Sequence, residues 1–92
     1  MENITGVVQI GNSDDKLPQS LWVKFMADVS RVIARHSNQV HFTGTSLPDA
    51  QWQNACWVFE IDRDREPHLH RDLEDICFSY YQESIAYNSS VS

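Results

Sequence analysis

The stretch ACWVFEI, Ala55–Ile61, decides the fold class that this sequence predicts. Side chains alternate between the two faces of a β-strand, so Trp57 and Phe59 would share one face. Cys56 and Val58 fall on the opposite face, which is therefore apolar as well. A strand that is apolar on both faces is typical of the centre of a sheet, where both sides need cover.

A second strand of this two-faced kind is predicted over Thr5–Ile10, where the adjacent Val7 and Val8 would point to opposite sides. Two other strands, over residues 40–44 and Ile85–Tyr87, are shorter and more polar, as edge strands are. We expect the residues after the last strand to form a frayed tail, Asn88–Ser92.

Two amphipathic helices are predicted between the strands, each beginning at a proline, Pro18 or Pro67, because the first turn of a helix tolerates the missing N–H. The apolar side chains that recur at helical spacing in the first helix are Trp22, Phe25, Met26, Val29 and Ile33. Those of the second helix, which we expect to run to about Gln82, are Leu69, Leu73, Ile76, Cys77 and Tyr80.

The resulting order is β-α-β-β-α-β, which predicts an α+β two-layer sandwich of the ferredoxin-like kind, with two helices on one face of a four-stranded antiparallel sheet. If Ser84–Asn88 continued the second helix instead, the sheet would have three strands. A chain of 92 residues has room for a single domain over 1–92, and we expect its ordered core to span about 4–88.

The balance of charges narrows the classes of partner. Thirteen acidic and seven basic residues give a net charge of -6, which disfavours nucleic acid and anionic membranes as partners.

Cys56 and Cys77 both lie in apolar stretches, which is typical of reduced, buried thiols in a cytoplasmic protein. The N-terminal residues have no signal-peptide pattern, and no segment has the length and apolarity of a membrane span.

The apolar residues on both faces of the central strands have a further consequence. Two helices cover only one face of such a sheet, so the other face needs another partner. We expect a homodimer through this open sheet face, with a different protein partner as the alternative.

No catalytic, cofactor or metal site is predicted. Cys56 and His41 form the one conceivable thiol–imidazole pair, but a cysteine in an apolar strand usually packs. His68 and His70 would point about 200° apart on a helix and so could not share a metal ion. The acidic turn over residues 62–66 lacks the glycine and spacing of a calcium loop, so we expect a solvated helix start.

Two polar segments are the candidate partner-binding surface. Their residues are Asn12, Asp14, Asp15, Trp52, Gln53 and Asn54. Tryptophan is favoured at binding hot spots, which makes Trp52 the central candidate. The structural alternative is that Asn12, Ser13 and the aspartates satisfy backbone N–H groups at the turn and the helix start, while Trp52 packs as a lid over the helix layer.

The same two segments, GNSDDKL (Gly11–Leu17) and WQNACW (Trp52–Trp57), resemble those of small uncharacterised proteins from actinobacteria and their phages. No activity, ligand or catalytic residue comes with this resemblance. It implies an intracellular accessory protein, in some cases encoded by a phage. The sequence departs from the expected pattern at Pro18, where a capping Thr or Ser would be usual.

Three function classes follow from these observations. The leading hypothesis is a non-enzymatic protein-binding or regulatory module that acts on a host or phage protein. The alternative is a small dimeric α+β-barrel-type enzyme, whose cavity between helices and sheet would be lined by His41, Trp52, Asn54 and Tyr80. A structural subunit of a larger particle is the third class.

Overall fold

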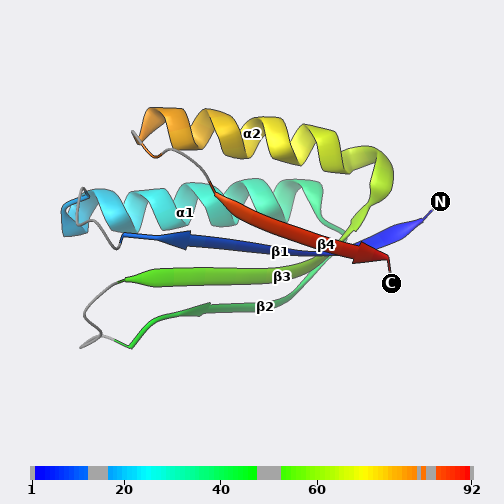
Figure 1. The fold of residues 1–92 in the computed structure, drawn as a ribbon, viewed down its shortest axis with the longest axis horizontal. Coiled ribbons are helices and arrows are strands. Elements are labelled where there is room, and N and C mark those ends of the chain that lie inside the picture. The colour runs from blue at the N-terminus through cyan, green and yellow to red at the C-terminus, as the bar shows by residue number, and fades with distance from the viewer. Residues whose placement is uncertain (1, 13–16, 48–52, 81, 83–84, 92) are drawn as a thin grey trace.

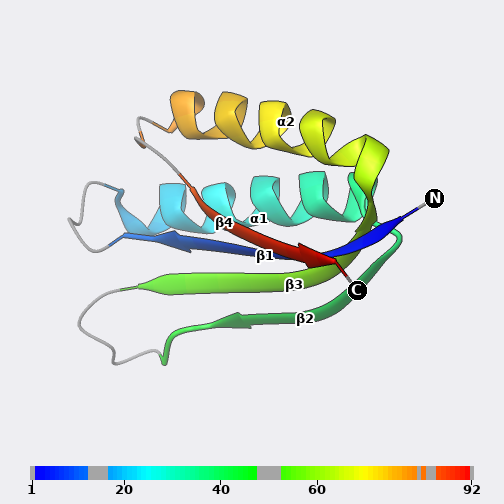
Figure 2. The same cartoon turned by 45° about the vertical axis from the view of Figure 1, so that its right-hand side comes forward.

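The computed structural model describes residues 2–12, 17–47, 53–80, 82 and 85–91. Its elements are β1 (Asn3–Gly11), α1 (Gln19–His36), β2 (Gln39–Thr45), β3 (Asn54–Asp62), a 3-10 turn η1 (Arg63–Arg65), α2 (Glu66–Ser79) and β4 (Ala86–Val91). The four strands form one antiparallel sheet in the order β2-β3-β1-β4, and both helices lie on one side of it (Figures 1 and 2). The predicted ferredoxin-like β-α-β-β-α-β fold is confirmed.

β1 and β3 occupy the centre of the sheet, as their two-faced sequences predict. Their pairing is unbroken, from Asn3 opposite Asp62 to Gly11 opposite Asn54. The side of this pair that faces the helices is buried through Ile4, Val8, Ile10, Ala55, Trp57, Phe59 and Ile61. The indole Nε1 of Trp57 is buried and has no hydrogen-bond partner among the described residues, a cost of about 1–3 kcal/mol that the surrounding apolar packing has to offset.

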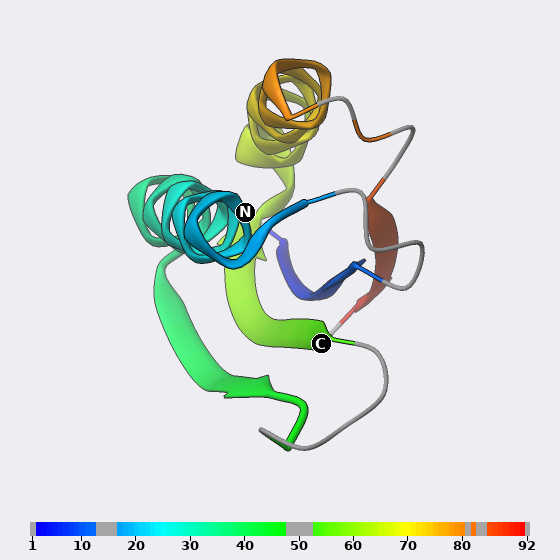
Figure 3. The same ribbon diagram turned by 90° about the vertical axis from the view of Figure 1, so that its left-hand side faces the viewer.

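The helices cover β1 and β3 from one side (Figure 3). α1 buries five apolar side chains, Trp22, Phe25, Val29, Val32 and Ile33, and α2 buries Leu69, Leu73 and Cys77. Pro67 lies in the first turn of α2, whereas Pro18 is the residue just before α1. The carbonyl of Pro18 accepts hydrogen bonds from Leu21 and Trp22, so the helix begins without a side-chain cap. Neither helix of the described chain is long and apolar enough to cross a membrane.

The C-terminal prediction was wrong in its boundaries. Residues 88–91 are not a frayed tail, because β4 runs over Ala86–Val91 and pairs with β1 from Gln9–Ala86 to Ile4–Val91. α2 ends at Ser79 rather than near Gln82, so the three-stranded alternative is also wrong. The polar residues Asn88, Ser89 and Ser90 give little sequence signal for a strand. They are nevertheless part of β4 because the edge of β1 has unpaired backbone N–H and C=O groups, to which residues 86–91 form hydrogen bonds.

Two polar contacts join the helices, each between the C-terminal end of one helix and the middle of the other. The Tyr80 hydroxyl donates a 2.6 Å hydrogen bond to Oδ2 of Asp28, and the Tyr80 ring packs against Phe25 with centroids 5.1 Å apart. At the other end, Nε2 of His36 lies 2.7 Å from Oδ2 of Asp72. The hydrogen bond from Tyr80 lowers the pKa of the Asp28 carboxyl, although burial opposes this, and the same bond raises the pKa of Tyr80.

We expect the contribution of the Tyr80–Asp28 bond to stability to depend on pH. The folded-state pKa of Asp28 lies below its unfolded value, so the contribution is present above pH about 4 and is lost as the pH falls through the folded value. The pKa of Tyr80 is raised in the folded state, so at high pH the contribution is fully present up to the ordinary value of about 10 and is lost as the pH rises through the higher folded value. Tyr80→Phe keeps the ring and should lower the free energy of unfolding by about 1 kcal/mol at pH 7, with a smaller difference from the wild type at pH 2.5. Urea denaturation at both pH values measures this, and a difference that does not change with pH would contradict it.

Candidate functional site

The first candidate site is the end of the molecule where β1 ends and β3 begins, since Gly11 pairs with Asn54 there. Asn12 follows β1 and is almost completely buried, with 3% of its surface exposed. Its Nδ2 donates to the carbonyl of Leu17 (2.8 Å), and its Oδ1 accepts from the N–H of Leu17 (3.1 Å). The Asn12 side chain therefore bonds to the backbone of Leu17, the residue that follows the 13–16 segment. For Asn12 this agrees with the structural alternative, in which its side chain satisfies backbone groups; its part in binding a partner stays a prediction.

Gln53 connects this turn to the β2–β3 connection. Its carbonyl accepts from the N–H of Asn12 (2.8 Å), and its side-chain Oε1 accepts from Nδ2 of Asn12 (3.1 Å). Its Nε2 donates to Oε1 of Gln19 at the start of α1 (2.9 Å). The two segments that were predicted to form one surface are thus hydrogen-bonded to each other.

Asn54 is exposed and lies next to Gln53 at the start of β3. Its backbone N–H donates to Oγ of Ser46 (3.0 Å), and its carbonyl accepts from the N–H of Ser46 (2.8 Å). Asp14, Asp15 and Trp52 lie outside the described residues, so their part in a partner-binding surface stays a prediction.

The second candidate site is the sheet face away from the helices, here called the open face. The register places on it the side chains of Thr5, Val7, Gln9, Phe42, Gly44, Cys56, Val58, Glu60, Ala86, Asn88 and Ser90. Phe42 is 55% exposed, and its ring lies so close over Gly44 that a Cβ there would approach it to 2.7 Å. A shallow hollow of about 330 Å³ beside Phe42 and Cys56 extends along this face to Asn54.

The open face carries little charge. Oε1 of Glu60 accepts a 2.7 Å hydrogen bond from Oγ1 of Thr5 and lies 3.4 Å from Nε2 of His41. No lysine or arginine belongs to the open face as defined above. In contrast, the outward surface of the helices carries charged pairs such as Asp28–Arg31. The one face without a helix is therefore also the face with the least charge.

The possible thiol–imidazole pair is not formed. Cys56 pairs with Gly44, whereas His41 lies at an irregularity of β2 between Val40 and Phe42. At about 3.3 Å per residue, this separates the two side chains along the sheet by roughly 7–10 Å. His41 instead contacts Glu60, and Cys56 is partly buried between Gln9 and Gly44, beside the hollow at Phe42, rather than fully buried as the sequence predicts.

His68 and His70, the two histidines considered as metal ligands, also have separate contacts. Nδ1 of His68 accepts from Nη2 of Arg71 (2.8 Å), while the His70 ring packs edge-on against Tyr87 with centroids 4.2 Å apart. Their divergence along the helix is as expected. Across the described parts of the chain, no group of three or more His, Cys, Asp or Glu side chains is placed to hold a metal ion.

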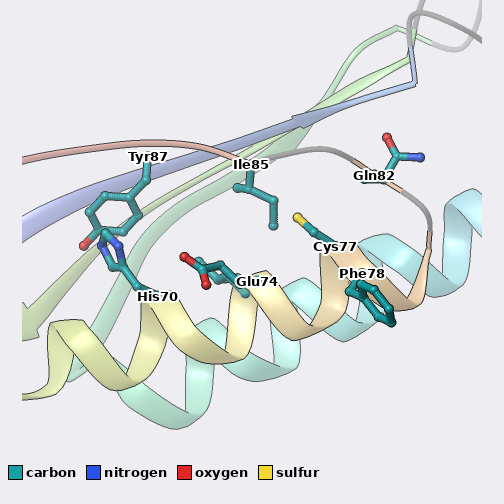
Figure 4. Close-up of a pocket in the computed structure, with 8 residues that line it drawn as sticks. His70, Glu74, Cys77, Phe78, Gln82, Ile85 and Tyr87 are labelled. Carbon is teal, nitrogen blue, oxygen red and sulfur yellow. The ribbon is translucent and has the colours of Figure 1, made fainter.

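The residues predicted to line an enzyme cavity do not come together. Tyr80 bonds to Asp28 between the helices, whereas His41 and Asn54 belong to the other side and the end of the sheet; Trp52 is outside the described residues. The structure has a different hollow, a cleft of about 420 Å³ between α2 and β4 (Figure 4). Leu73 and Cys77, one helical turn apart, line this cleft. Their spacing predicts an apolar helix face but does not by itself predict a cleft.

Comparison with known proteins supports the fold and no family. No protein-family model matches the chain, and no curated protein matches it. Among solved structures, a hydroxynitrile lyase from Passiflora edulis has a TM-score of 0.65 at 13% identity, covering 99% of this chain and 94% of that one. A dimeric ferredoxin-like protein from an uncultured marine organism has a TM-score of 0.59 at 11% identity, covering 100% and 96%. An uncharacterized protein from Thermotoga maritima has a TM-score of 0.54 at 10% identity, covering 98% and 95%. At identities this low, these TM-scores establish a shared ferredoxin-like fold and nothing beyond the fold.

We expect Asn12 to be a residue that holds the candidate surface in place. Asn12→Ala leaves the N–H and carbonyl of Leu17 and the Gln53 amide without their present partner, and should lower the free energy of unfolding by about 2–3 kcal/mol. Asn38→Ala is the control, because Asn38 is exposed and its amide bonds to Asp62 at 3.1 Å, so it should cost less than about 1 kcal/mol. Urea denaturation of the two variants makes the comparison. Equal losses would contradict the role assigned to Asn12.

Proposed function

We propose that this protein is a homodimeric, non-enzymatic binding module that dimerises through the open face and presents the Asn12–Gln53 end to a protein partner. The observation that carries the proposal is the apolar centre of the open face, which no helix covers. The exposed Phe42 and the half-buried Val7, Cys56 and Val58 lie there on adjacent strands. Large exposed apolar patches usually mark interaction sites. Two similar solved structures are described as dimeric ferredoxin-like proteins, which fits a second copy as the occupant.

The distribution of charge also favours a second copy over other occupants. A chain with a net charge of -6 repels its own copies through most of its surface. The open face is the exception, because Glu60 is its one carboxylate and contacts both Thr5 and His41. Two such faces can approach with little electrostatic cost, and isologous contact of one patch with itself is the commonest form of dimer.

The partner-binding end is supported by the hydrogen bonds that join its two segments. Because Asn12 and Gln53 fix the β1–α1 turn against the β2–β3 connection, residues on both sides would act as one surface. The unpaired Cys56 and Cys77 fit a reducing compartment, so we place the protein in the cytoplasm. The resemblance of both segments to proteins of actinobacteria and their phages supports an accessory role. If a phage encodes the protein, it would act in the cytoplasm of the infected host.

An enzymatic alternative has one supporting observation, the cleft between α2 and β4. The hydroxynitrile lyase shares the fold with this chain but not its sequence. The residues that the sequence assigned to an enzyme cavity are dispersed, so the binding module has the better support.

We expect one substitution on the open face to abolish the dimer. Phe42→Asp adds a carboxylate to each copy at an already exposed position, so the fold should persist while burial in the dimer becomes costly. In size-exclusion chromatography with light scattering at about 100 μM, above the Kd of most stable dimers, the wild type should have about twice the 10.6 kDa mass of the chain. The variant should have the mass of a monomer.

The matched control is Val23→Asp, because Val23 is 56% exposed on the outer side of α1. It adds the same charge at similar exposure, away from the open face, and should remain dimeric. A monomeric wild type, or equal dissociation of both variants, would overturn the proposed interface.

We expect the partner-binding end to be separable from the dimer. Trp52→Ala combined with Asp14→Ala should remain dimeric but reduce capture of a specific protein from a bacterial host extract by at least about tenfold, as hot-spot removal does. The control combines Val23→Ala with Asp75→Ala, an apolar and an acidic residue on the helices. Quantitative mass spectrometry compares wild type, variant and control. If every captured protein is retained equally by all three, this end of the molecule is not the binding surface.

A further inference from the structure

The cleft between α2 and β4 lies on the helix side of the sheet and is separate from both surfaces discussed above. Its volume is about 420 Å³, within the range of roughly 300–1,000 Å³ that is usual for small-molecule sites. Figure 4 shows side chains from α2 on one side, and Ile85 and Tyr87 on the other, facing one another across it.

The cleft exists because Tyr87 is directed toward the start of α2. Its hydroxyl donates a 2.8 Å hydrogen bond to Oε2 of Glu66, and its Oη lies where a Cβ on Gly6 would approach it to 3.1 Å. The Tyr87 side chain thus reaches toward Glu66, away from the second half of α2, and the space between Ile85 and that half of the helix stays open.

The inner wall of the cleft is apolar. Leu73 and Cys77 are 4% and 5% exposed and project from successive turns of α2, opposite the half-buried Ile85. Burial, and next the negative charge of Glu74, raises the pKa of the Cys77 thiol to about 11. Cys77 is therefore a neutral thiol at physiological pH, and this wall suits an apolar body such as an aromatic ring.

The mouth of the cleft is acidic. Glu74 is exposed there, one turn after His70, whose ring packs against Tyr87. Arg71 lines the neighbouring hollow, but its guanidinium donates to His68 rather than to a residue of the cleft. Glu74 is thus the one carboxylate that lines the cleft in the described structure, and the net charge of -6 adds to its effect on any charged ligand.

We propose that this cleft binds a small organic amine, with its apolar or aromatic body against Leu73, Cys77 and Ile85 and its protonated amine at the Glu74 carboxylate. Anionic molecules of the same shape, such as aromatic acids, should bind more weakly because the Glu74 carboxylate repels them. Because the cleft and the open face lie on opposite sides of the sheet, the site is present in monomer and dimer alike and does not rest on the proposed function.

Three matched probes test the ligand class: 2-phenylethylamine, 2-phenylethanol and 3-phenylpropanoate, which share the ring and differ in the end group. Each is titrated into the ¹⁵N-labelled protein and followed in ¹H–¹⁵N correlation spectra. We expect the amine to shift the amide signals of Leu73, Glu74, Cys77 and Tyr87, and to bind about threefold to tenfold more tightly than the alcohol. The carboxylate should bind most weakly.

The variant Glu74→Gln should remove the preference for the amine over the alcohol without changing the affinity for the alcohol. Asp75→Asn is its control: the adjacent residue lines the hollow between the helices, and the substitution removes the same charge. The control should keep the preference, because Asp75 does not line the cleft. If the preference came from the net charge of the protein, both variants would weaken it equally. Equal affinity for the three probes, or no shift at the cleft residues at millimolar amine, would overturn the proposal.

Discussion

The unbroken antiparallel ladder between β1 and β3 sets the position of every other element. It pairs nine residues on each strand, from Asn3–Asp62 to Gly11–Asn54, and both strands bury their helix-facing side chains almost completely. Val8 and Phe59 are fully buried near its centre, where loss of a large side chain would cost about 2–5 kcal/mol. β2 and β4 then pair with the outer edges of this ladder, and the helices can cover only one of its faces.

This arrangement explains why two different surfaces remain available. The connections that follow β1 and precede β3 must meet at one end of the ladder, and the hydrogen bonds between Asn12 and Gln53 fix that meeting. The other face of the ladder receives no helix, yet Val7, Val58 and Cys56 make its centre apolar. A sheet that is apolar on both sides is stable in water when the second side is also covered. The dimer proposal is the consequence of that requirement.

The sequence predicts the elements whose signal is periodic. In β3, every second side chain of residues 55–61 is buried, and in α1 the buried side chains from Trp22 to Ile33 follow the 3.6-residue period of a helix. Both periods are visible in the sequence, so β3 and α1 are found where expected. The extent of β4 was not predictable in this way. Ser89 and Ser90 are ordered by backbone hydrogen bonds to β1, which depend on the neighbouring strand rather than on their own side chains.

The candidate sites were predictable only in part for a related reason. The topology predicts that residues near 12 and 53 are neighbours. It does not predict the hydrogen bonds of the Asn12 side chain to the backbone of Leu17, which depend on local backbone geometry. The separation of Cys56 from His41 depends on the irregularity in β2, for which the sequence has no clear signal. The cleft depends on the direction in which Tyr87 turns, and this is decided by a hydrogen bond to Glu66, 21 residues earlier in the chain.

β4 is where the two proposed binding functions meet. Ala86, Asn88 and Ser90 belong to the open face, whereas Tyr87, between the first two, borders the cleft on the other side. Tyr87 packs against the core, but Ala86, Asn88, Ser89 and Ser90 are exposed, so the order of these four residues rests mainly on pairing with β1. A second copy against one side and a ligand against the other would each add contacts to this strand. Such added contacts stabilise the folded state in proportion to occupancy, so the strand with the weakest sequence signal gains most from the partners that the structure leaves room for.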